Sequence, residues 1–375
     1  MDELKITDIQ TICMRVTYEG HQRVQSALGV WNHRNGMFLL VHTDAGITGL
    51  GEIFCNFPQW SHYEKEASVH QGLKPMLIGA DPLDREGIWA TIGRKFKRIG
   101  LQWGAPGIAY QVLSGLDIAL WDIQGKAEDK SICELLESSA ESVPVYCSAL
   151  GPDGVAEQAA RFWEQGVTAF KLKIGMDPKQ DIRNLSELRR LVGPDCLVMA
   201  DVNQGWDLET ALEMAPLLEP FHLYWVEEPL MADHVEDLEV LVRKTGMRIA
   251  GGENLYGADF ERHLAKGLLQ VCQPDVTKCG GITEFMKAAR LAHQYGVEVA
   301  PHFLANGVGY AATMQVMNAS GAHIMEYDHG DNPMKDTCVT GTYPVKEGRV
   351  KIPKGPGLGI SLCEEEIQRY VFHPY

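Results

Sequence analysis

The stretch Leu197-Val198-Met199-Ala200-Asp201-Val202-Asn203 decides the fold, because a short apolar run ends in two polar side chains. The same pattern recurs seven times, at Val143–Ser148, Ala169–Ile174, Leu223–Glu227, Ile249–Glu253, Val271–Asp275, Val297–His302 and Ile324–Tyr327. Amphipathic helical stretches lie between these runs, among them Asp207–Leu218, Val235–Lys244, Asp259–Leu268 and Ile282–Tyr295. Eight strands that alternate with helices over about 200 residues predict a (β/α)₈-type barrel of the α/β class.

Nearly every one of these runs ends in a side chain that a buried strand should avoid. The strand-end residues are Lys171, Lys173, Asp201, Asn203, Glu227, Glu253, Asp275, His302 and Glu326. From Lys173 onward, one such residue per strand recurs at intervals of 22 to 28 residues, which is the length of one strand–helix unit. Because the C-terminal strand ends of such a barrel form its active site, we expect all of them at one mouth.

Three of these residues are carboxylates from adjacent predicted strands, namely Asp201, Glu227 and Glu253. Desolvated negative charges that lie together repel each other unless protons or a cation intervene. Carboxylate oxygens suit Mg²⁺, so we expect one Mg²⁺ ion per active site. The alternative is that each carboxylate caps a helix or pairs with an arginine. Glu228 is offset by one residue and should point away, so it is not an expected ligand.

Lys171 and Lys173 lie two residues apart and should therefore share one face of their strand. Alone, such a pair usually marks a solvated strand edge. Here two close ammonium groups with a cation nearby are expected to lower each other's pKa, so that one is neutral near pH 7 and acts as a base. Lys173 is the better candidate because it lies nearer the mouth.

His302 and Asp275 are expected on neighbouring strands on the opposite side of the mouth. An aspartate beside a histidine fixes the tautomer and raises the basicity of the imidazole, which gives a second base. Glu326 on the last strand could donate a hydrogen bond to a substrate carboxylate if the site keeps it protonated. Taken singly, each of these residues would more often be structural.

On either side of the predicted barrel the sequence lacks the regular alternation of strands and helices. Met37–His42 and Ile47–Phe54 read as antiparallel strands joined by a turn, and helical patterning from about Trp60 ends at Gly125. After Gly341 the alternation of strands and helices stops. We therefore expect an N-terminal α+β capping domain at 1–125, a barrel at 126–342 and a C-terminal segment at 343–375 that packs back on the cap.

Composition excludes several classes of function. The formal net charge of −16 argues against nucleic-acid binding, which needs clustered Lys and Arg. No run of 18 apolar residues is present, so a membrane span is not expected. The nine cysteines are scattered without a C-x-x-C pair, which fits reduced thiols in a cytoplasm better than a secreted protein.

Taken together, these motifs resemble the enolase superfamily, and within it the mandelate racemase subgroup, over nearly the whole chain. The capping part carries Gly51-Glu52 and Ser114-Gly115-Leu116-Asp117-Ile118-Ala119-Leu120-Trp121-Asp122. The barrel part carries Phe170-Lys171-Leu172-Lys173, Trp225-Val226-Glu227-Glu228-Pro229, Gly252-Glu253-Asn254, Gln273-Pro274-Asp275 with Lys278 and Gly280-Gly281, and Pro301-His302. Each motif is weak alone, and the set is highly specific.

The resemblance implies a role for each strand-end residue. Asp201, Glu227 and Glu253 match the Mg²⁺ ligands, and Lys173 and His302 match bases on the two faces of the substrate. In the same comparison Asp275 orients His302, Glu326 is the electrophilic acid, Lys171 is a helper lysine and Asn203 lies near the substrate hydroxyl. Barrels of this type are commonly oligomers, so a homo-oligomer is expected.

Enzymes of this subgroup remove the proton α to a carboxylate, and Mg²⁺ stabilises the enediolate. The pair Lys173 and His302 is typical of acid-sugar dehydratases, which give 2-keto-3-deoxy acids. A racemase or epimerase, or a lactone cycloisomerase to which the chain is also similar, would share the first step. In all three cases the expected partner is a small hydroxylated carboxylate.

Substrate specificity is expected to come from two loops of the cap, within His21–Asn35 and around Phe54–Tyr63. These stretches hold His21, Arg23, Trp31, His33, Arg34 and Trp60. Their polar and cationic content suits a hydroxylated anion. Beside Asn203, the expected substrate-binding residues are Ser148, Trp31 and His33.

Two other classes of function remain open from the residues alone. In one, Lys173 or Lys278 forms a Schiff base, as in a class I aldolase. In the other, the barrel is a metal-stabilised sensor of sugar acids. The sensor is disfavoured because a binding protein has no need of two opposed bases.

Overall fold

The structure is a computed structural model that describes residues 4–18, 24–341 and 343–373. Its main sheet runs in the order β12, β11, β10, β9, β8, β7, β6 and β13, with every neighbouring pair parallel. The bounds are β6 Ser142–Leu150, β7 Ala169–Lys173, β8 Leu197–Asp201, β9 Val226–Glu227, β10 Ile249–Gly251, β11 Val271–Cys272, β12 Glu298–Val299 and β13 Met325–Asp328. The two ends of this path meet where His323 N donates to Val299 O at 3.2 Å. The predicted curled parallel sheet is confirmed.

The interior of the barrel begins with one apolar layer. It contains one buried residue from each strand or its flank, namely Tyr146, Ala169, Met199, Trp225, Ala250, Val271, Ala300 and Ile324. Because side chains two residues apart share a face, the next inward layer consists of strand-end polar residues. The apolar layer thus forms the floor of the barrel mouth, and the polar side chains stand above it.

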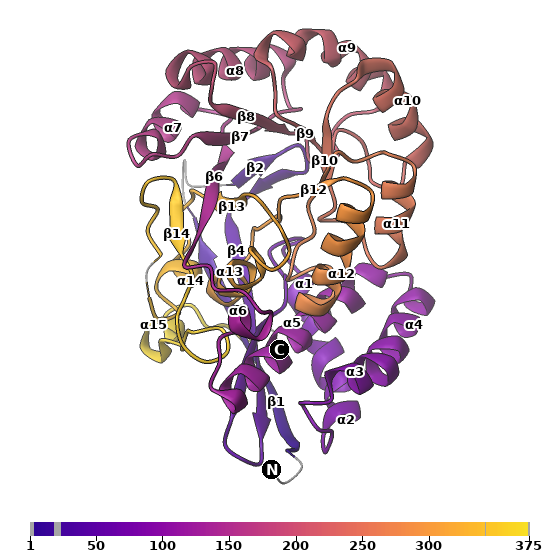
Figure 1. The fold of residues 1–375 in the computed structure, drawn as a ribbon, viewed down its shortest axis with the longest axis vertical. Helices are drawn as coiled ribbons and strands as arrows, with labels where there is room; N and C mark the ends of the chain where they lie inside the picture. Colours follow the sequence, from indigo (N-terminus) through magenta and orange to yellow (C-terminus); the bar gives the residue numbers. More distant parts are fainter. Residues whose placement is uncertain (1–3, 19–23, 342, 374–375) are drawn as a thin grey trace.

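Helices surround the barrel on the outside (Figure 1). They are α7 Val155–Trp163, α8 Pro178–Val192, α9 Leu208–Leu218, α10 Val235–Thr245, α11 Ala258–Ala265, α12 Gly281–Gln294 and α13 Gly307–Val316. Each buries an apolar stripe against the outward-facing strand residues; in α8, for example, Leu185, Leu188 and Val192 are buried. A short helical turn, η4 Glu219–Phe221, follows α9.

The N-terminal part is an antiparallel sheet packed on a long helix, in the lower part of Figure 1. Strand β1 Ile6–Thr17 pairs with β4 His33–Thr43, which pairs with β5 Thr48–Glu52. Helix α5 Pro106–Glu128 lies against β5 so closely that a Cβ at Gly51 would come within 1.9 Å of Gly115 O. A separate buried apolar core fills this part.

The remaining elements of this part are short. They are β2 Val24–Ser26, β3 Gly29–Trp31, α1 Ser61–Ala67, η2 Ser68–Leu73, α2 Lys74–Leu77, α3 Arg85–Ile88, η3 Trp89–Gly93, α4 Arg94–Trp103 and α6 Ile132–Leu135. Strands β2 and β3 form a hairpin that reaches the barrel, where a Cβ at Gly205 would lie 2.5 Å from Ala27 Cβ. The hairpin therefore packs on the loop that follows β8.

The expected end of the long helix at Gly125 is wrong by one turn. Helix α5 continues to Glu128 and ends where Asp129 takes a left-handed conformation, at φ 55°. Gly125 stays helical because it packs against the tail: a Cβ there would lie 2.5 Å from Gly357 Cα. The glycine serves a close approach between two segments and does not end the helix.

The C-terminal tail contacts both parts of the molecule. Its elements are α14 Pro333–Asp336, β14 Arg349–Lys351 and α15 Glu364–Gln368. Strand β14 pairs antiparallel with β6, while Arg15 N donates to Tyr370 O at 2.9 Å and Phe372 N donates to Cys13 O at 3.0 Å. The division of the chain at 125 and 342 stays a prediction. No helix in the described residues has the length and apolarity needed to cross a membrane.

Candidate active site

Lys171 and Lys173 both point into the barrel mouth, as their spacing predicts. The Nζ atom of Lys171 lies 2.7 Å from both carboxylate oxygens of Glu227 and 2.9 Å from Glu326 Oε1. Lys173 Nζ donates to Asp201 Oδ2 at 2.5 Å. Leu172, between the two lysines, is fully buried in the core under the helices. The lysines therefore lie among the predicted carboxylates, and the solvated-edge alternative is wrong.

Asp201 and Asn203 form the next part of the site, at the end of β8. Asp201 is a register partner of Lys173 on one side and of Glu227 on the other. Asn203 Oδ1 accepts from Lys173 Nζ at 2.8 Å, and Asn203 N donates to Asp201 Oδ1 at 2.9 Å. Asn203 has φ 47°, a left-handed conformation that asparagine tolerates better than most residues. This turn brings its amide back to Lys173.

Glu253 reaches the mouth against the alternation of its own strand. Ala250 faces the barrel interior, so strict alternation would direct residue 252 inward and residue 253 outward. Gly252 breaks the pattern with φ 140°, and a Cβ at this position would lie 2.9 Å from Gln273 N. Glu253 Oε2 consequently lies inside the mouth, 3.3 Å from His302 Nε2.

His302 and Asp275 meet on the other side of the mouth, as predicted. His302 Nδ1 lies 2.7 Å from Asp275 Oδ2, and Asp275 Oδ1 accepts from both the backbone and the hydroxyl of Thr277 at 2.6 Å. Both members of the pair are buried. The Asp275 contact orients the imidazole so that Nε2 faces Glu253 and the mouth.

Glu326 and Ser148 lie between the two sides, on the adjacent strands β13 and β6. The hydroxyl of Ser148 donates to Glu326 Oε1, and Phe303 N donates to Glu326 Oε2 at 3.0 Å. Glu326 Oε2 also lies 4.0 Å from His302 Nε2. Ser148 therefore contacts the site through Glu326, and its role in substrate binding stays a prediction.

The two lysines repel each other as expected, but the neighbouring carboxylates outweigh this repulsion, so the predicted net lowering of the lysine pKa is not found. Burial lowers the pKa of Lys173, but the charge of Asp201 outweighs burial and the repulsion of Lys171, and the pKa is raised. Burial is likewise outweighed at Lys171 by Glu227 and Glu326, which raise its pKa well above the usual range. Direct pairing with carboxylates dominates because each ammonium group has an acidic partner within hydrogen-bond distance.

The expectation of a protonated Glu326 is also wrong in this structure. Burial raises the pKa of Glu326, but the positive charges of Lys171 and His302 outweigh burial, and the pKa is lowered. For His302, burial lowers the pKa, while Glu253, Glu326 and Asp275 raise it to about 9. These contacts favour the charged form of the His302 imidazole and the ionised form of the Glu326 carboxyl group.

The three predicted metal ligands are buried at the ends of three adjacent strands. As the side chains lie, residues 4–18, 24–341 and 343–373 hold no group of three His, Cys, Asp or Glu arranged around one point. Each carboxylate instead faces a cation: Asp201 faces Lys173, Glu227 faces Lys171 and Glu253 faces Lys278. An all-oxygen donor set held under desolvation fits Mg²⁺ by its chemistry.

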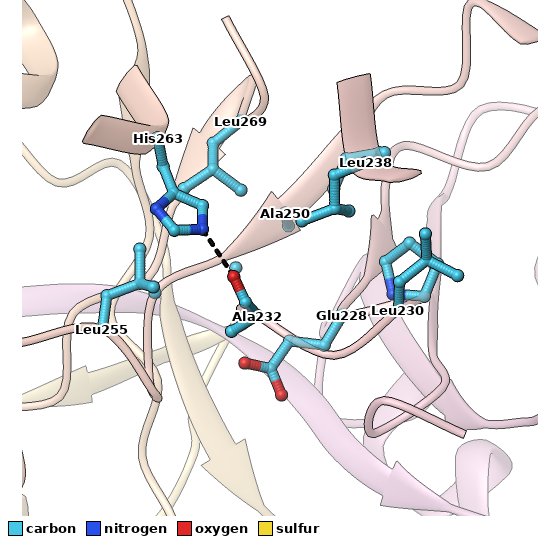
Figure 2. A pocket seen from close by; sticks show the side chains of 12 residues that line it. Glu228, Leu230, Ala232, Leu238, Ala250, Leu255, His263 and Leu269 are labelled. Carbon is cyan, nitrogen blue, oxygen red and sulfur yellow. Dashed lines mark hydrogen bonds between the residues drawn. The ribbon is translucent and has the colours of Figure 1, made fainter. Parts of the chain in front are cut away.

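Glu228 lies on the other face of its strand, as its offset by one residue predicts. Its Cγ is 3.7 Å from the position of a Cβ on the outward face of Gly251, and both carboxylate oxygens accept from Asn254 Nδ2 at 3.0 Å. It borders a cavity of about 20 Å³ outside the barrel strands. In Figure 2 the Glu228 carboxylate lies below Ala232, and the ring of His263 is hydrogen-bonded to Ala232 O.

Trp31 and His33 are two of the predicted specificity residues, and the neighbours found for them, Phe57 and Arg15, belong to the cap. The ring of Trp31 packs edge-on against Phe57 at 5.3 Å, and burial and then Arg15 lower the pKa of His33. Within the described residues, Trp31 and His33 have no hydrogen bond or ion pair with a strand-end residue. Their role in substrate binding stays a prediction. His21 and Arg23 lie outside the described residues.

Several residues of the site were not predicted from the strand ends. Gln273 Nε2 donates to Glu227 Oε2 at 2.7 Å, and it lies two residues before Asp275, so strict alternation could have found it. Lys278 Nζ donates to Glu253 Oε2 at 2.7 Å and lies 4.9 Å from the centre of the Phe54 ring of the cap. Burial lowers the pKa of Lys278, but the charge of Glu253 outweighs burial and raises it.

Arg34, from the specificity loop, is the cap residue that contacts the last barrel strand. Its guanidinium lies 2.6 Å from Asp328 Oδ2, two residues after Glu326, and both side chains are about 3% exposed. Burial raises the pKa of Asp328, but Arg34 and Lys335 outweigh burial and lower it to about 2. No sequence signal pairs Arg34 with Asp328, which lies in another part of the fold.

Two family models match the chain. The model of the mandelate racemase/muconate lactonizing enzyme N-terminal domain matches residues 8–137, and the enolase C-terminal domain-like model matches residues 154–366. Together the two models span both the N-terminal sheet with its helix and the barrel.

Curated relatives and solved structures match over nearly the full length. The chain is 31% identical to a D-galactarolactone cycloisomerase from Agrobacterium fabrum, over 98% of this chain and 99% of the relative. It is 28% identical to an arabinonate dehydratase from Saccharolobus solfataricus, over 97% and 99% of the two chains. A crystal structure of a racemase from Streptomyces coelicolor with bound magnesium superposes with a TM-score of 0.85 at 29% identity, covering 98% of this chain and all of the other.

Proposed function

The chain belongs to the mandelate racemase subgroup of the enolase superfamily, and from this premise we propose that it is a Mg²⁺-dependent acid-sugar dehydratase. The substrate is a small hydroxylated carboxylate. Its α-proton is removed to give an enediolate, its β-hydroxyl leaves as water, and the resulting enol becomes a 2-keto-3-deoxy acid. Relatives of this chain are named as acid-sugar dehydratases and cycloisomerases, which supports this type of reaction.

One observation carries the proposal: two ionisable groups from opposite sides of the barrel mouth each face one of the three proposed metal-binding carboxylates. Lys173 lies on β7 against Asp201, and His302 follows β12 and lies 3.3 Å from Glu253. A substrate held between them has one such group on each face. A binding protein has no use for that arrangement, which supports an enzyme over a sensor.

We assign Lys173 as the base that takes the α-proton and His302 as the acid that protonates the departing β-hydroxyl. His302 suits the second role because Asp275 orients its ring and its pKa is raised to about 9, where burial is outweighed by Glu253, Glu326 and Asp275. Asn203 Oδ1 holds Lys173 Nζ at 2.8 Å and thereby directs it. Proton transfer by such groups typically contributes 10²- to 10⁴-fold.

Asp201, Glu227 and Glu253 would hold the Mg²⁺ ion, with Lys171 and Glu326 beside them. When bound, Mg²⁺ would supply positive charge that stabilises the negative charge developing on the substrate carboxylate and would offset the charge of Asp201, which raises the pKa of Lys173. Lys171, 2.7 Å from Glu227 and 2.9 Å from Glu326, adds a second fixed positive charge next to the same region. Ser148, Trp31 and His33 remain the proposed substrate contacts.

A lactone cycloisomerase is the second candidate, because the 31% identical relative carries that name and matches over nearly its full length. A racemase or epimerase that uses the same two groups is the third. All three reactions begin with loss of the α-proton and differ in the step that follows. They therefore share one experiment.

The experiment is a proton NMR screen of galactarate, galactonate, arabinonate and their lactones with the protein and Mg²⁺ in D₂O. A 2-keto-3-deoxy product establishes dehydration and names the substrate. Loss of the α-proton signal without a new product indicates racemisation or epimerisation, and a rearranged lactone indicates cycloisomerisation. If no compound loses its α-proton, the proposed reaction type is wrong.

A further inference from the structure

The loops that carry Asp275 and His302 are each followed by a barrel helix that lacks a cap of its own. Helix α12 follows Gly280 and helix α13 follows Asn306, and neither of these N-cap residues supplies a side-chain cap. The first turn of a helix leaves backbone N–H groups without intrahelical partners. In both helices side chains from the N-terminal domain accept these hydrogens.

Glu52, at the end of β5, caps helix α13. Its Oε1 accepts from Asn306 N at 2.7 Å and from Asn306 Nδ2 at 2.9 Å, while its Oε2 accepts from Gly309 N at 2.7 Å. The side chain is fully buried. Both carboxylate oxygens are therefore used to hold the segment that begins four residues after His302.

Ser114 and Asp117, one turn apart on α5, cap helix α12 in the same way. Ser114 Oγ accepts from Gly280 N at 2.8 Å and from Gly281 N at 3.0 Å, and Asp117 Oδ2 accepts from Thr283 N at 2.9 Å. A Cβ at Gly281 would lie 2.4 Å from Asp117 Cβ, so the helices touch at this point. The long helix of the cap thus fixes the start of α12.

A short and tightly bonded loop connects this cap to Asp275. The carbonyl of Asp275 accepts from Lys278 N at 3.0 Å and from Cys279 N at 2.8 Å, directly before Gly280. Thr277 N donates to Asp275 Oδ1 at 2.6 Å. A loop closed by three such bonds has little freedom, so a shift of Gly280 carries Asp275 with it.

The two capped segments also contact each other. A Cβ at Gly309, in the first turn of α13, would lie 2.6 Å from Thr277 Cγ2 and 3.3 Å from Glu52 Oε2. Thr277 belongs to the Asp275 loop, and Gly309 follows the His302 loop. The cap side chains, the two loops and the Asp275–His302 hydrogen bond of 2.7 Å therefore form one connected unit.

The lysine side of the barrel is built differently. Helix α8, which follows Lys173, is capped by Asp177, and helix α9, which follows Asn203, is capped by Asp207. Both capping residues belong to the barrel itself. Nothing from the N-terminal domain is needed to start these two helices.

We propose that Glu52 and Asp117 are positioning residues for the Asp275–His302 pair, so that the N-terminal domain sets the geometry of one catalytic group and leaves Lys173 to the barrel. The catalytic part of this inference rests on the proposed function. A displacement of about 1 Å can reduce a rate about 10²-fold. The step that uses His302 should therefore depend on two side chains that never touch substrate.

The test compares Glu52→Gln and Asp117→Asn with Asp122→Asn in the full-length, Mg²⁺-loaded protein. Asp122 is a matched control, because it is a fully buried carboxylate on the same helix α5. It accepts from Leu50 N and Leu358 N at 2.8 Å and pairs with Lys126, all in the cap and tail. Asp122→Asn therefore perturbs the N-terminal domain but leaves the N-terminal hydrogen bonds of helices α12 and α13 in place.

The first measurement is the low-field proton NMR signal of His302 Nδ1–H bonded to Asp275, assigned by its absence in His302→Asn. It needs no substrate, so its outcome is independent of the proposed reaction. We expect the signal in wild type and Asp122→Asn, and an upfield shift or loss in Glu52→Gln and Asp117→Asn. An unchanged signal in both variants, or an equal loss in Asp122→Asn, would overturn the inference.

The second measurement uses whichever acid sugar the screen identifies. Glu52→Gln and Asp117→Asn should slow formation of the keto acid about 10²-fold, while α-deuterium exchange by Lys173 changes less than about twofold. Equal loss of both would mean a general structural defect and contradict the proposal. If Glu52→Gln or Asp117→Asn fails to fold, two milder variants replace them. These are Glu52→Asp, which keeps the charge, and Ser114→Ala, at the same contact as Asp117. Both should slow keto-acid formation more than α-deuterium exchange, but to a smaller degree.

Discussion

The two sides of the barrel mouth are held in place by different means. On the lysine side, Lys171 and Lys173 are fixed by carboxylates from three other barrel strands, at 2.5 to 2.9 Å. On the histidine side, Asp275 and His302 lie on loops whose helices are capped by Glu52 and Asp117 of the N-terminal domain. The helix caps on the lysine side belong to the barrel, and the helix caps on the histidine side come from the N-terminal domain.

This difference suggests how closure of the N-terminal domain over the substrate can be coupled to the positioning of a catalytic group. A cap that closes over the mouth excludes water and strengthens electrostatic interactions inside it. Because the same cap positions His302, the acid is in place only when the cap is correctly docked. The base on the other side needs no such contact. Each prediction below tests one part of this contrast.

The largest effect should follow removal of Mg²⁺, which acts on carboxylates shared by both sides. We expect EDTA to lower turnover about 10³-fold or more, because a metal ion supplies several kcal/mol of charge stabilisation. Added Mg²⁺ should restore the rate. If the treated protein formed the keto acid at an unchanged rate, these carboxylates would pair with the lysines without binding a catalytic Mg²⁺ ion.

The next largest effect concerns the lysine side. Replacing Lys171 by Met should lower the free energy of unfolding by about 3–5 kcal/mol, because it leaves the buried Glu227 and Glu326 without their partner. Urea denaturation measures this loss. The control is Lys179→Met, at an exposed position on α8, which should change stability by less than about 0.5 kcal/mol. A loss below about 1 kcal/mol would mean that this side does not depend on its own ion pairs.

A third contact joins cap and barrel without touching either catalytic group. The pKa of Asp328 is lowered from 3.8 to about 2, because Arg34 and Lys335 outweigh its burial. A lowered folded-state pKa adds stability above pH 4 that is lost as the pH falls towards 2. The stability difference between wild type and Asp328→Asn should therefore shrink by about 2 kcal/mol between pH 5 and pH 2.

Chemical denaturation across that pH range measures the effect. Asp336→Asn is the control, because Asp336 is half exposed and pairs with Lys335 at 3.4 Å. At pH 5 this control should cost less stability than Asp328→Asn, because the Asp336 side chain is half exposed and its ion pair is screened by solvent. A stability difference for Asp328→Asn that stays constant with pH would mean that the buried ion pair does not add to the docking of the cap.

The smallest effect concerns the cap of helix α8 on the lysine side. Asp177 accepts from Lys179 N at 2.8 Å and from Gln180 N at 3.2 Å, so Asp177→Ala should cost about 1 kcal/mol of stability. The ratio of α-deuterium exchange to product formation should stay at its wild-type value. A change in that ratio as large as that of Glu52→Gln would remove the distinction between the two sides.

Most of the barrel could be predicted from its strand pattern. Inward residues lie two apart along each strand, so Lys171, Asp201, Glu227, His302 and Glu326 fall at the same mouth. The resemblance to a family then supplied their expected roles. Local periodicity was sufficient because a parallel barrel repeats one geometry in every unit.

The rest depends on features that periodicity does not carry. Glu253 faces inward because Gly252 adopts φ 140°, and α5 continues past Gly125, where the glycine allows close approach of the tail at Gly357. The lowered pKa of Glu326 follows from its contacts with Lys171 and His302. The hydrogen bond from Asn306 N to Glu52, which caps helix α13, joins residues more than 250 positions apart in the sequence. Such long-range pairs become visible only in the folded molecule.

The most direct test of the account compares Lys173→Gln with His302→Asn in D₂O with Mg²⁺ and the acid sugar that the wild-type protein consumes. Proton NMR follows α-deuterium exchange and keto-acid formation in the same sample. We predict that His302→Asn still exchanges the α-proton but forms about 10²- to 10⁴-fold less product, and that Lys173→Gln does neither. Dehydration by His302→Asn at the wild-type rate, or α-exchange by Lys173→Gln, would contradict the assignment of the two sides.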